Sequence, residues 1–261
     1  MQLQSLPPIA LVLALALSGL AIRAAEIEAQ VPVQLPAQAP ADSPAQVQAQ
    51  APVACRLALV LALDISASVD EEEYELLRSG TAAALASPEV TAAIQALGGV
   101  YVSVFEWSGR YKQRPIATWT LLDGPGAIRG LAGAIATHPR STSEYPTALG
   151  AALGHAATLL ARGPKPCERR VIDVAGDGAN NHGFGPRHAY RAFDFNEITV
   201  NGLVVVGSDA RVIDYYRDEV IRGPASFLEI AAGYRDFEQA MKRKLLREIG
   251  AMSLATLEET E

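Results

Sequence analysis

Three oxygen-bearing side chains, Asp64, Ser66 and Ser68, stand at alternating positions where an apolar run ends. The run, LALVLALD over residues 57–64, is typical of a strand that is buried on both faces. Alternating side chains can turn to one side as a strand leaves its sheet, and hard cations such as Mg²⁺ prefer oxygen ligands. The triplet therefore predicts part of a divalent-metal site that serves binding and not catalysis.

Two other segments bring oxygen ligands to the same edge of the predicted sheet. Asp177 ends a second apolar run, VIDVAGD, and Thr147 stands at the start of a predicted helix. Helix capping is the alternative role, because Asp and Ser after a strand commonly begin the next helix. For Asp64 alone capping would be preferred, but its pairing with Asp177 favours a metal. For Ser68 and Asp70 capping is expected in addition to any metal role.

Strand-like and helix-like segments alternate along the chain from residue 56 onward. The alternation predicts an α/β fold with a doubly wound, mostly parallel sheet, helices on both faces and residues 115–122 as an antiparallel edge strand. Helical spacing predicts inward-facing residues such as Leu77 in the first helix and Met241 in the last. The predicted strands are 57–64, 99–107, 115–122, 169–176, 198–207 and 226–232, and the predicted helices are 70–86, a short one from 88, 125–136, 147–162, 209–221 and 234–249.

The D-x-S-x-S run at residues 64–68, Thr147 ahead of a Gly-containing helix and the strand-terminal Asp177 resemble the von Willebrand factor type A (vWA) domain. The resemblance spans residues 56–250 and implies a Rossmann-like fold that carries a metal-ion-dependent adhesion site. Segments such as DEEEY, VFEWSG and VIDVAGDGANN are similar to an exported bacterial branch of that superfamily without an assigned biochemical role. Residue by residue, the resemblance implies a metal-ligand set of Asp64, Ser66, Ser68, Thr147 and Asp177.

The ligand set that the resemblance implies would leave a dication under-neutralised, because its hydroxyls are neutral and one of its two carboxylates often acts through water. The cation, Mg²⁺ with Mn²⁺ or Ca²⁺ as alternatives, would keep an open position for the Asp or Glu side chain of a protein partner. Tyr145-Pro146 replaces the small residues that usually precede the family's Thr, and it is expected to narrow access to the metal. The predicted rim that a partner contacts consists of Tyr145, Asn180, Asn181 and Trp107.

Two other functions are alternatives for the same site. A metal-dependent phosphohydrolase could use Asp64 and Asp177. The predicted site, however, lacks the second carboxylate cluster, the lysine and the general base that such an enzyme needs. A structural domain with a degenerate metal site is the other alternative. His182 and His188 could join Asp177 around a transition metal, but they are interpreted as surface loop residues because the sequence has no tight HxxxH or HExxH pair.

The charge pattern argues against nucleic acid as a partner. The formal net charge is −7, and Lys and Arg are scattered, whereas phosphate binding needs a concentrated basic face. The one basic run, at residues 242–247 and including Lys244, is interpreted as a solvated helix face. Asp173 falls inside a predicted buried strand and needs a partner, for which Arg169 or Arg170 is the expectation.

The N-terminal part is not expected to belong to the fold. Residues 9–22 form an apolar run shorter than a membrane span, so residues 1–25 are predicted to be a signal peptide, with an uncleaved membrane anchor as the alternative. Residues 26–54, rich in Ala, Pro and Gln, are predicted to be an extended linker, 55–250 the domain and 251–261 a C-terminal tail. The domain is thus expected to be periplasmic or secreted, with membrane contact only if the first segment is uncleaved.

Cys55 and Cys167 are the only two cysteines of the chain. An even pair in an exported chain favours a disulfide, with two buried free thiols as the alternative. Each cysteine stands near the start of a predicted strand that ends at Asp64 or Asp177. If these strands are parallel and adjacent, the cysteines lie at the end of the sheet opposite the metal.

Overall fold

The computed structural model describes residues 55–207 and 210–258. The predicted signal peptide, residues 1–25, and the predicted linker, residues 26–54, lie outside the described residues, with Ala54 as the last of them. Within the described ranges, no helix combines the length and apolar character needed to cross a membrane.

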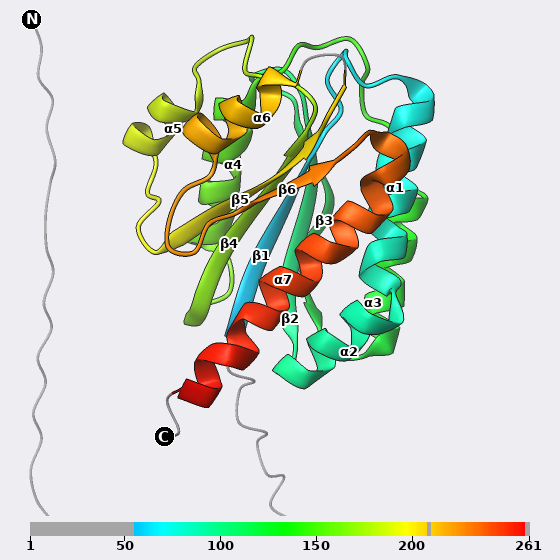
Figure 1. Cartoon of the computed structure of the whole chain (residues 1–261), viewed down its shortest axis with the longest axis vertical. Helices are drawn as coiled ribbons and strands as arrows, with labels where there is room; N and C mark the ends of the chain where they lie inside the picture. The colour runs from blue at the N-terminus through cyan, green and yellow to red at the C-terminus, as the bar shows by residue number, and fades with distance from the viewer. Residues whose placement is uncertain (1–54, 208–209, 259–261) are drawn as a thin grey trace, which may run out of the picture. The chain divides into compact units, whose positions relative to one another are not determined.

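Six strands form one sheet: β1 (Cys55–Asp64), β2 (Val100–Trp107), β3 (Gln113–Leu122), β4 (Cys167–Gly176), β5 (Ile198–Val205) and β6 (Leu228–Ala231). The order across the sheet is β3-β2-β1-β4-β5-β6. Neighbouring strands are parallel except for β2 and β3, which are antiparallel. The predicted mostly parallel sheet with one antiparallel edge strand is therefore confirmed (Figure 1).

Helices cover both faces of this sheet (Figure 1). One face is covered by α1 (Glu71–Ala86), α2 (Pro88–Leu97), α3 (Pro125–Ala136) and α7 (Phe237–Glu258), which follows a short turn, η2 (Tyr234–Asp236). The other face is covered by α4 (Leu149–Arg162), α5 (Pro186–Ala192), α6 (Arg211–Tyr215) and its continuation η1 (Tyr216–Val220).

Two helix predictions differ from the structure. The sequence does not predict α5, because its seven residues are too few to show a helical period. Residues 251–261 are predicted to be a tail, yet α7 continues to Glu258. Residues 251–258 contain no proline, the residue that most strongly breaks a helix.

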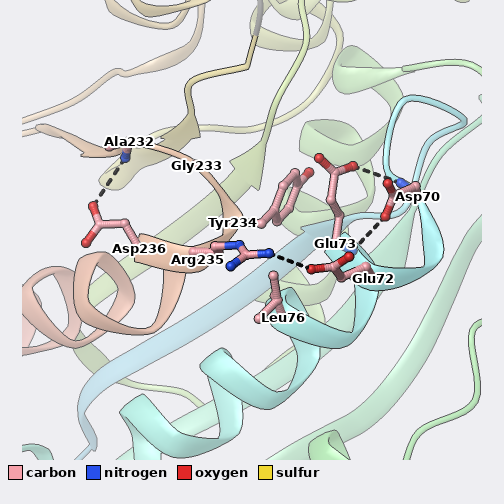
Figure 2. Close-up of a pocket in the computed structure, with 9 residues that line it drawn as sticks. All are labelled: Asp70, Glu72, Glu73, Leu76, Ala232, Gly233, Tyr234, Arg235 and Asp236. Carbon is pink, nitrogen blue, oxygen red and sulfur yellow. Dashed lines mark hydrogen bonds and ion pairs between the residues drawn. The ribbon is translucent and has the colours of Figure 1, made fainter.

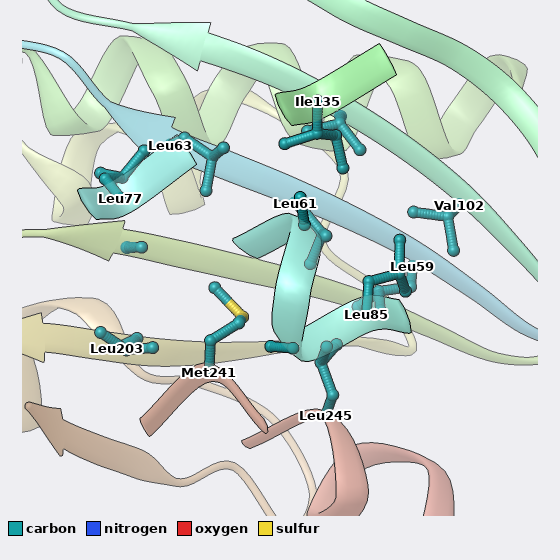
Figure 3. Close-up of a cluster of buried hydrophobic side chains, with 14 of the residues drawn as sticks. Leu59, Leu61, Leu63, Leu77, Leu85, Val102, Ile135, Leu203, Met241 and Leu245 are labelled. Atoms are coloured by element: carbon teal, nitrogen blue, oxygen red, sulfur yellow. The ribbon is translucent and has the colours of Figure 1, made fainter. Parts of the chain in front are cut away.

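The core on the α1 and α7 side fixes the central strand. Leu59, Leu61 and Leu63 of β1 share one face of the strand and lie in a cluster with Leu77 of α1 and Met241 of α7 (Figure 3). The alternate residues of β1 belong to the cluster on the α4 side, as the two-residue period of a strand requires. Both faces of β1 are thus packed, and the strand delivers its last residue to a defined place at the sheet edge.

A disulfide lies at the other end of the same strand. Cys55 and Cys167 are directly opposite each other in the parallel pairing of β1 with β4, and they are joined with their Cα atoms 4.5 Å apart. The predicted pairing is therefore confirmed. Because the two strands are parallel, the disulfide stands at the end of the sheet opposite Asp64.

Two predictions about charged residues are wrong. Lys244 is predicted to be solvated, but its position on α7 faces inward, and its side chain is completely buried. Its ammonium contacts Oδ1 of Asp173 and lies 3.2 Å from Oε1 of Glu248. Asp173 therefore pairs with Lys244 and not with Arg169 or Arg170.

Candidate metal centre

Asp64 ends β1 and is completely buried. Its Oδ1 accepts a hydrogen bond from the backbone N of Ser66 at 2.8 Å, which holds the chain as it bends away from the sheet. The next turn ends at Asp70, whose side chain accepts from the backbone N of Glu73 and caps α1. The capping role predicted for Asp70 is therefore confirmed, and the turn between the two aspartates carries Ser66 and Ser68.

A chain of hydrogen bonds connects the residues of the predicted ligand set. Ser68 Oγ donates to Oδ1 of Asp177, just beyond β4, at 2.8 Å. Ser66 Oγ lies 3.2 Å from Ser68 Oγ, and Thr147 Oγ1 donates to Ser66 Oγ at 3.2 Å. Ser68 therefore reaches across to the neighbouring strand, and the cap predicted for it is provided by Asp70 alone. With Asp64 bonded to the backbone of Ser66, all five predicted residues meet at one edge of the sheet.

The loop after β4 holds the start of α4 through two asparagines. Asn181 Oδ1 accepts from the backbone N of Thr147 at 2.9 Å, and Asn180 Oδ1 accepts from the backbone N of Gly150 at 3.2 Å. The loop passes so close to α4 that a Cβ on Gly150 would lie 2.1 Å from a backbone oxygen. The side-chain oxygens of both asparagines thus face the helix start, and their predicted contact with a partner stays a prediction.

The other two predicted rim residues have different outcomes. Trp107 is completely buried in the cluster on the α4 side, so its prediction as a rim residue is wrong. The alternation of β2 directs this side chain inward. Tyr145 is half-buried beside the site: its carbonyl accepts from the backbone N of Ala67 at 2.9 Å, and the ammonium of Lys112 lies 4.3 Å from its ring centre. Its contact with a partner stays a prediction.

One carboxylate oxygen of Asp64 has no hydrogen-bond partner in the described part of the chain. This oxygen, Oδ2, is buried. Burial, followed by the negative charge of Asp177, raises the pKa of the Asp64 carboxyl to about 8. A buried carboxylate is costly unless it is paired or binds a metal. The donor set of two carboxylates and three hydroxyls, with one buried oxygen unpaired, therefore fits an oxygen-ligated dication.

Two tyrosine hydroxyls lie beside the same carboxylates. Tyr216 of η1 and Tyr234 of η2 are buried, and neither hydroxyl has a hydrogen-bond partner among residues 55–207 and 210–258. Burial first, and then the charges of Asp64 and Asp177, raise the pKa of each phenol. Such hydroxyls can donate to water or to carboxylates around a cation. The sequence does not mark either tyrosine as a site residue, because the helical period places Tyr234 only on an inward face.

The histidines do not assemble with Asp177. His182 Nδ1 accepts from the backbone N of Arg110 at 3.4 Å, and His188 is exposed on α5. Across the residues that the structure describes, no group of three or more His, Cys, Asp and Glu side chains could hold a metal. The candidate centre is thus built from oxygen atoms, a set that suits Mg²⁺, Mn²⁺ or Ca²⁺.

Arg140 is a positioning residue that the sequence does not single out. Its side chain is 8% exposed, and Nη2 donates to the backbone oxygens of Ile65, Ser66 and Val69 at 3.2, 3.3 and 2.7 Å. Its Nε donates to the backbone oxygen of Thr142 at 3.0 Å. One guanidinium therefore fixes the whole turn between β1 and α1. No period or motif marks this position, because it lies in an irregular segment.

Glu106 of β2 anchors the same irregular segment. Its buried carboxylate accepts from the Tyr74 hydroxyl at 2.7 Å and from the backbone N of Ser141 at 3.2 Å. His138 Nε2 lies 3.6 Å from the same carboxylate. These contacts tie the stretch that leads to Thr147 onto the sheet and α1.

An acidic pocket of about 450 Å³ lies between the first turn of α1 and the segment from β6 to α7 (Figure 2). Its carboxylates already have partners. Asp70 and Glu73 each accept from the other's backbone N, at 2.8 and 2.9 Å. Glu72 pairs with Arg235 at 3.1 Å, and Asp236 accepts from a backbone N of its own loop at 3.2 Å. The pocket therefore reflects helix capping and loop anchoring beside the candidate metal centre.

The fold and the arrangement of its polar edge define a vWA-like domain. The central strand is followed by the D-x-S-x-S turn, and Thr147 and Asp177 lie beside that turn in the order the resemblance requires. The chain belongs to the family described as a protein of unknown function (DUF1194), whose model matches residues 54–253. None of the curated proteins matches the sequence.

Solved structures share the fold at low sequence identity. Proximal thread matrix protein 1 from the mussel byssus, with a zinc-occupied MIDAS motif, aligns at TM-score 0.56 and 13% identity, over 74% of this chain and 48% of that one. A von Willebrand factor type A structure from Catenulispora acidiphila aligns at TM-score 0.53 and 14% identity, over 76% of this chain and 43% of that one. The pilus adhesin SpaC from Lactobacillus rhamnosus GG aligns at TM-score 0.54 and 13% identity, over 75% of this chain and 31% of that one. These likenesses show the fold alone, and the chain spans less than half the length of each of these structures.

Proposed function

We propose that the protein is an exported, metal-dependent protein-binding module that presents a bound divalent cation to an Asp or Glu side chain of its partner. The observation that carries the proposal is the meeting of Asp64 and Asp177 with three hydroxyls at one sheet edge. The vWA-like neighbours, which include a matrix protein and a pilus adhesin, support a binding role and not an enzymatic one.

The cation would be held by two carboxylates and three hydroxyls, directly or through water. Because the three hydroxyls are neutral and one carboxylate would act through water, a dication would keep Lewis acidity and a position open to a partner carboxylate. Mg²⁺ is the proposed ion, with Mn²⁺ or Ca²⁺ as alternatives. The residues that would hold it are Asp64, Ser66, Ser68, Thr147 and Asp177.

Other residues of the chain would keep these ligands in position. Arg140 fixes the backbone of the turn that carries the two serines, and Asn181 fixes the backbone of Thr147. Tyr145 and Pro146 stand beside the turn and would restrict which side chains can approach. Such preorganised surroundings favour binding, because little order is lost when the partner arrives.

Export is part of the proposal. The Cys55–Cys167 disulfide fits an oxidising compartment, and residues 1–25 are proposed as the signal that takes the chain to the periplasm or the exterior. The named neighbours from a byssus and a pilus are in keeping with such a location.

The proposed function is tested by capturing partners from the exported proteins of the producing cells on the immobilised protein. Retention is expected in Mg²⁺, with release by EDTA and by a glutamate-containing competitor peptide, and loss in Asp64→Ala. Asp123→Asn, at an exposed position beyond β3, is the matched control and should retain the same proteins. Retention that persists in EDTA or in Asp64→Ala would overturn the proposal.

A further inference from the structure

A buried cluster of ionisable side chains joins α7 to the sheet. Lys244 of α7 is completely buried, and its ammonium contacts Oδ1 of Asp173, a buried residue of β4. Glu248, one turn further along α7 and also completely buried, lies 3.2 Å from the same ammonium. Asn201 of β5 donates to Glu248 and accepts from the backbone N of Phe227 at 2.8 Å. The metal centre uses none of these groups.

The cluster contains two carboxyl groups for one ammonium. Oδ2 of Asp173 and Oε2 of Glu248 are buried and have no hydrogen-bond partner in the described ranges. The nearest other cation, Arg169, is 3.8 Å from Glu248 and 29% exposed. Burial, followed by the charge of Glu248, raises the pKa of the Asp173 carboxyl well above its usual range. One buried ammonium is thus held against two buried carboxyl groups, and burial favours the protonated form of Asp173.

We propose that Lys244 and Asp173 become joined by an intramolecular amide bond, with Glu248 as the proton carrier. Glu248 accepts a proton from the ammonium, and the free amine attacks the Asp173 carboxyl carbon to form the C–N bond. The C–O bond to the carboxyl hydroxyl then breaks, and this oxygen leaves as water after receiving a proton by way of Glu248. The ammonium and the neutral carboxyl thereby become an amide and water, with the remaining proton on Glu248. No oxidant or reductant is needed.

The position of the three groups favours this reaction over a lasting ion pair. The fold holds the amine against the carboxyl group, which turns a bimolecular condensation into a step within one molecule. The centre of the Phe227 ring lies 4.8 Å from Lys244 Nζ, and the ring helps to exclude water from these buried side chains. The burial of two ionisable groups is costly. An amide bond would put one neutral group in their place. The bond would tether α7 to β4, as the disulfide tethers β1 to β4.

Intact-mass measurement of the purified full chain tests the proposal directly. After its N-terminus has been determined and its disulfide reduced, the wild type should be lighter than its sequence by one water molecule. Lys244→Arg, whose guanidinium is not a comparable nucleophile, and Glu248→Gln, which cannot carry the proton, should both show the full mass. Lys242→Arg alters the neighbouring lysine, which pairs with Glu89 on the surface, and it should keep the mass loss.

Tryptic digestion locates the bond without any variant, so a misfolded mutant cannot obscure the result. The expected product is a branched peptide in which residues 171–187 are joined to residues 244–247, because trypsin does not cleave after an acylated lysine. Release of the free peptide 245–247 in full yield, together with the full mass of the wild type, would overturn the proposal. Complete bond formation in Glu248→Gln would overturn the role of Glu248.

Discussion

The protonation of Asp64 controls whether the candidate metal centre can bind a cation. One of its carboxylate oxygens is bound by the backbone of Ser66, and the other is buried without a partner in the described structure. A desolvated carboxyl group beside another carboxylate favours its protonated form. A proton and a dication would therefore compete for Asp64, which links metal binding to pH.

The metal-free protein should lose stability as the pH rises from about 4 to about 8. The pKa of Asp64 is about 8 in the folded chain and 3.8 ordinarily, so the folded state holds this proton more tightly. That contribution is fully present below the unfolded pKa and is lost as the pH rises through the folded pKa. Thermal unfolding in EDTA should show this slope in the wild type and a flatter one in Asp64→Asn. Equal slopes in the two proteins would contradict the assignment.

Arg140→Lys should weaken Mg²⁺ binding about 10-fold or more, the usual effect of losing a group that orients metal ligands. A lysine keeps the charge, but it lacks the planar fork that reaches three backbone oxygens of the β1–α1 turn. Arg129→Lys, at an exposed position of α3, is the matched control and should bind as the wild type does. Calorimetric titration measures both, and wild-type affinity in Arg140→Lys would show that the turn needs no such support.

Elements with a strong period could be predicted from the sequence, and elements without one could not. β1 was recognisable because it is apolar throughout, and α1 because Asp70 and three glutamates precede its buried stripe. The seven residues of α5 show no such period. The prediction of Trp107 as a rim residue is wrong because its position at the end of β2, and not its residue type, decides which way its side chain faces.

The candidate site divides in the same way. Asp64, Asp177 and the hydroxyl residues stand at strand ends and a helix start, where chain order alone brings them together. Arg140 reaches the site from an irregular segment through contacts to backbone atoms, which leave no pattern in the sequence. For Lys244 the sequence pattern is misleading. The basic run around it predicts a solvated side chain, but its position on the inward face of α7 buries it.

Gly150→Ala tests how α4 and the loop after β4 position Thr147. The added Cβ would lie 2.1 Å from a backbone oxygen of that loop, so the loop must move. We expect a loss of about 1–3 kcal/mol of stability, as for other overpacked sites, together with weaker Mg²⁺ binding. Gly130→Ala on α3 meets open space and should be neutral or stabilising by up to about 1 kcal/mol. Urea unfolding compares them, and an unaffected Gly150→Ala would contradict this account of the loop.

The disulfide and the candidate metal ligands lie at opposite ends of the sheet. The disulfide joins β1 and β4 where they begin, and the candidate metal ligands follow where the same strands end. Because the packed strands lie between them, a change at the disulfide end should alter stability without altering metal binding.

Replacing both Cys55 and Cys167 by alanine should lower the free energy of unfolding by about 2–5 kcal/mol, mainly because the unfolded chain is no longer cross-linked. Mg²⁺ affinity should stay unchanged, since the ligands lie at the opposite end of the sheet. Denaturant unfolding and metal titration of the same variant check both statements. A large loss of metal affinity in a folded variant would show that the two ends are coupled.

The most direct test of the central claim is calorimetric titration of Mg²⁺ into the wild type and into Asp64→Asn. The substitution keeps an oxygen for the backbone N of Ser66 but removes the buried charge. Saturable binding is expected in the wild type, with proton release that reflects the raised pKa of Asp64. Asp64→Asn is expected to lose this binding while it unfolds at the same or a higher temperature in EDTA. Absence of binding by the wild type, or equal binding by folded Asp64→Asn, would contradict the central claim.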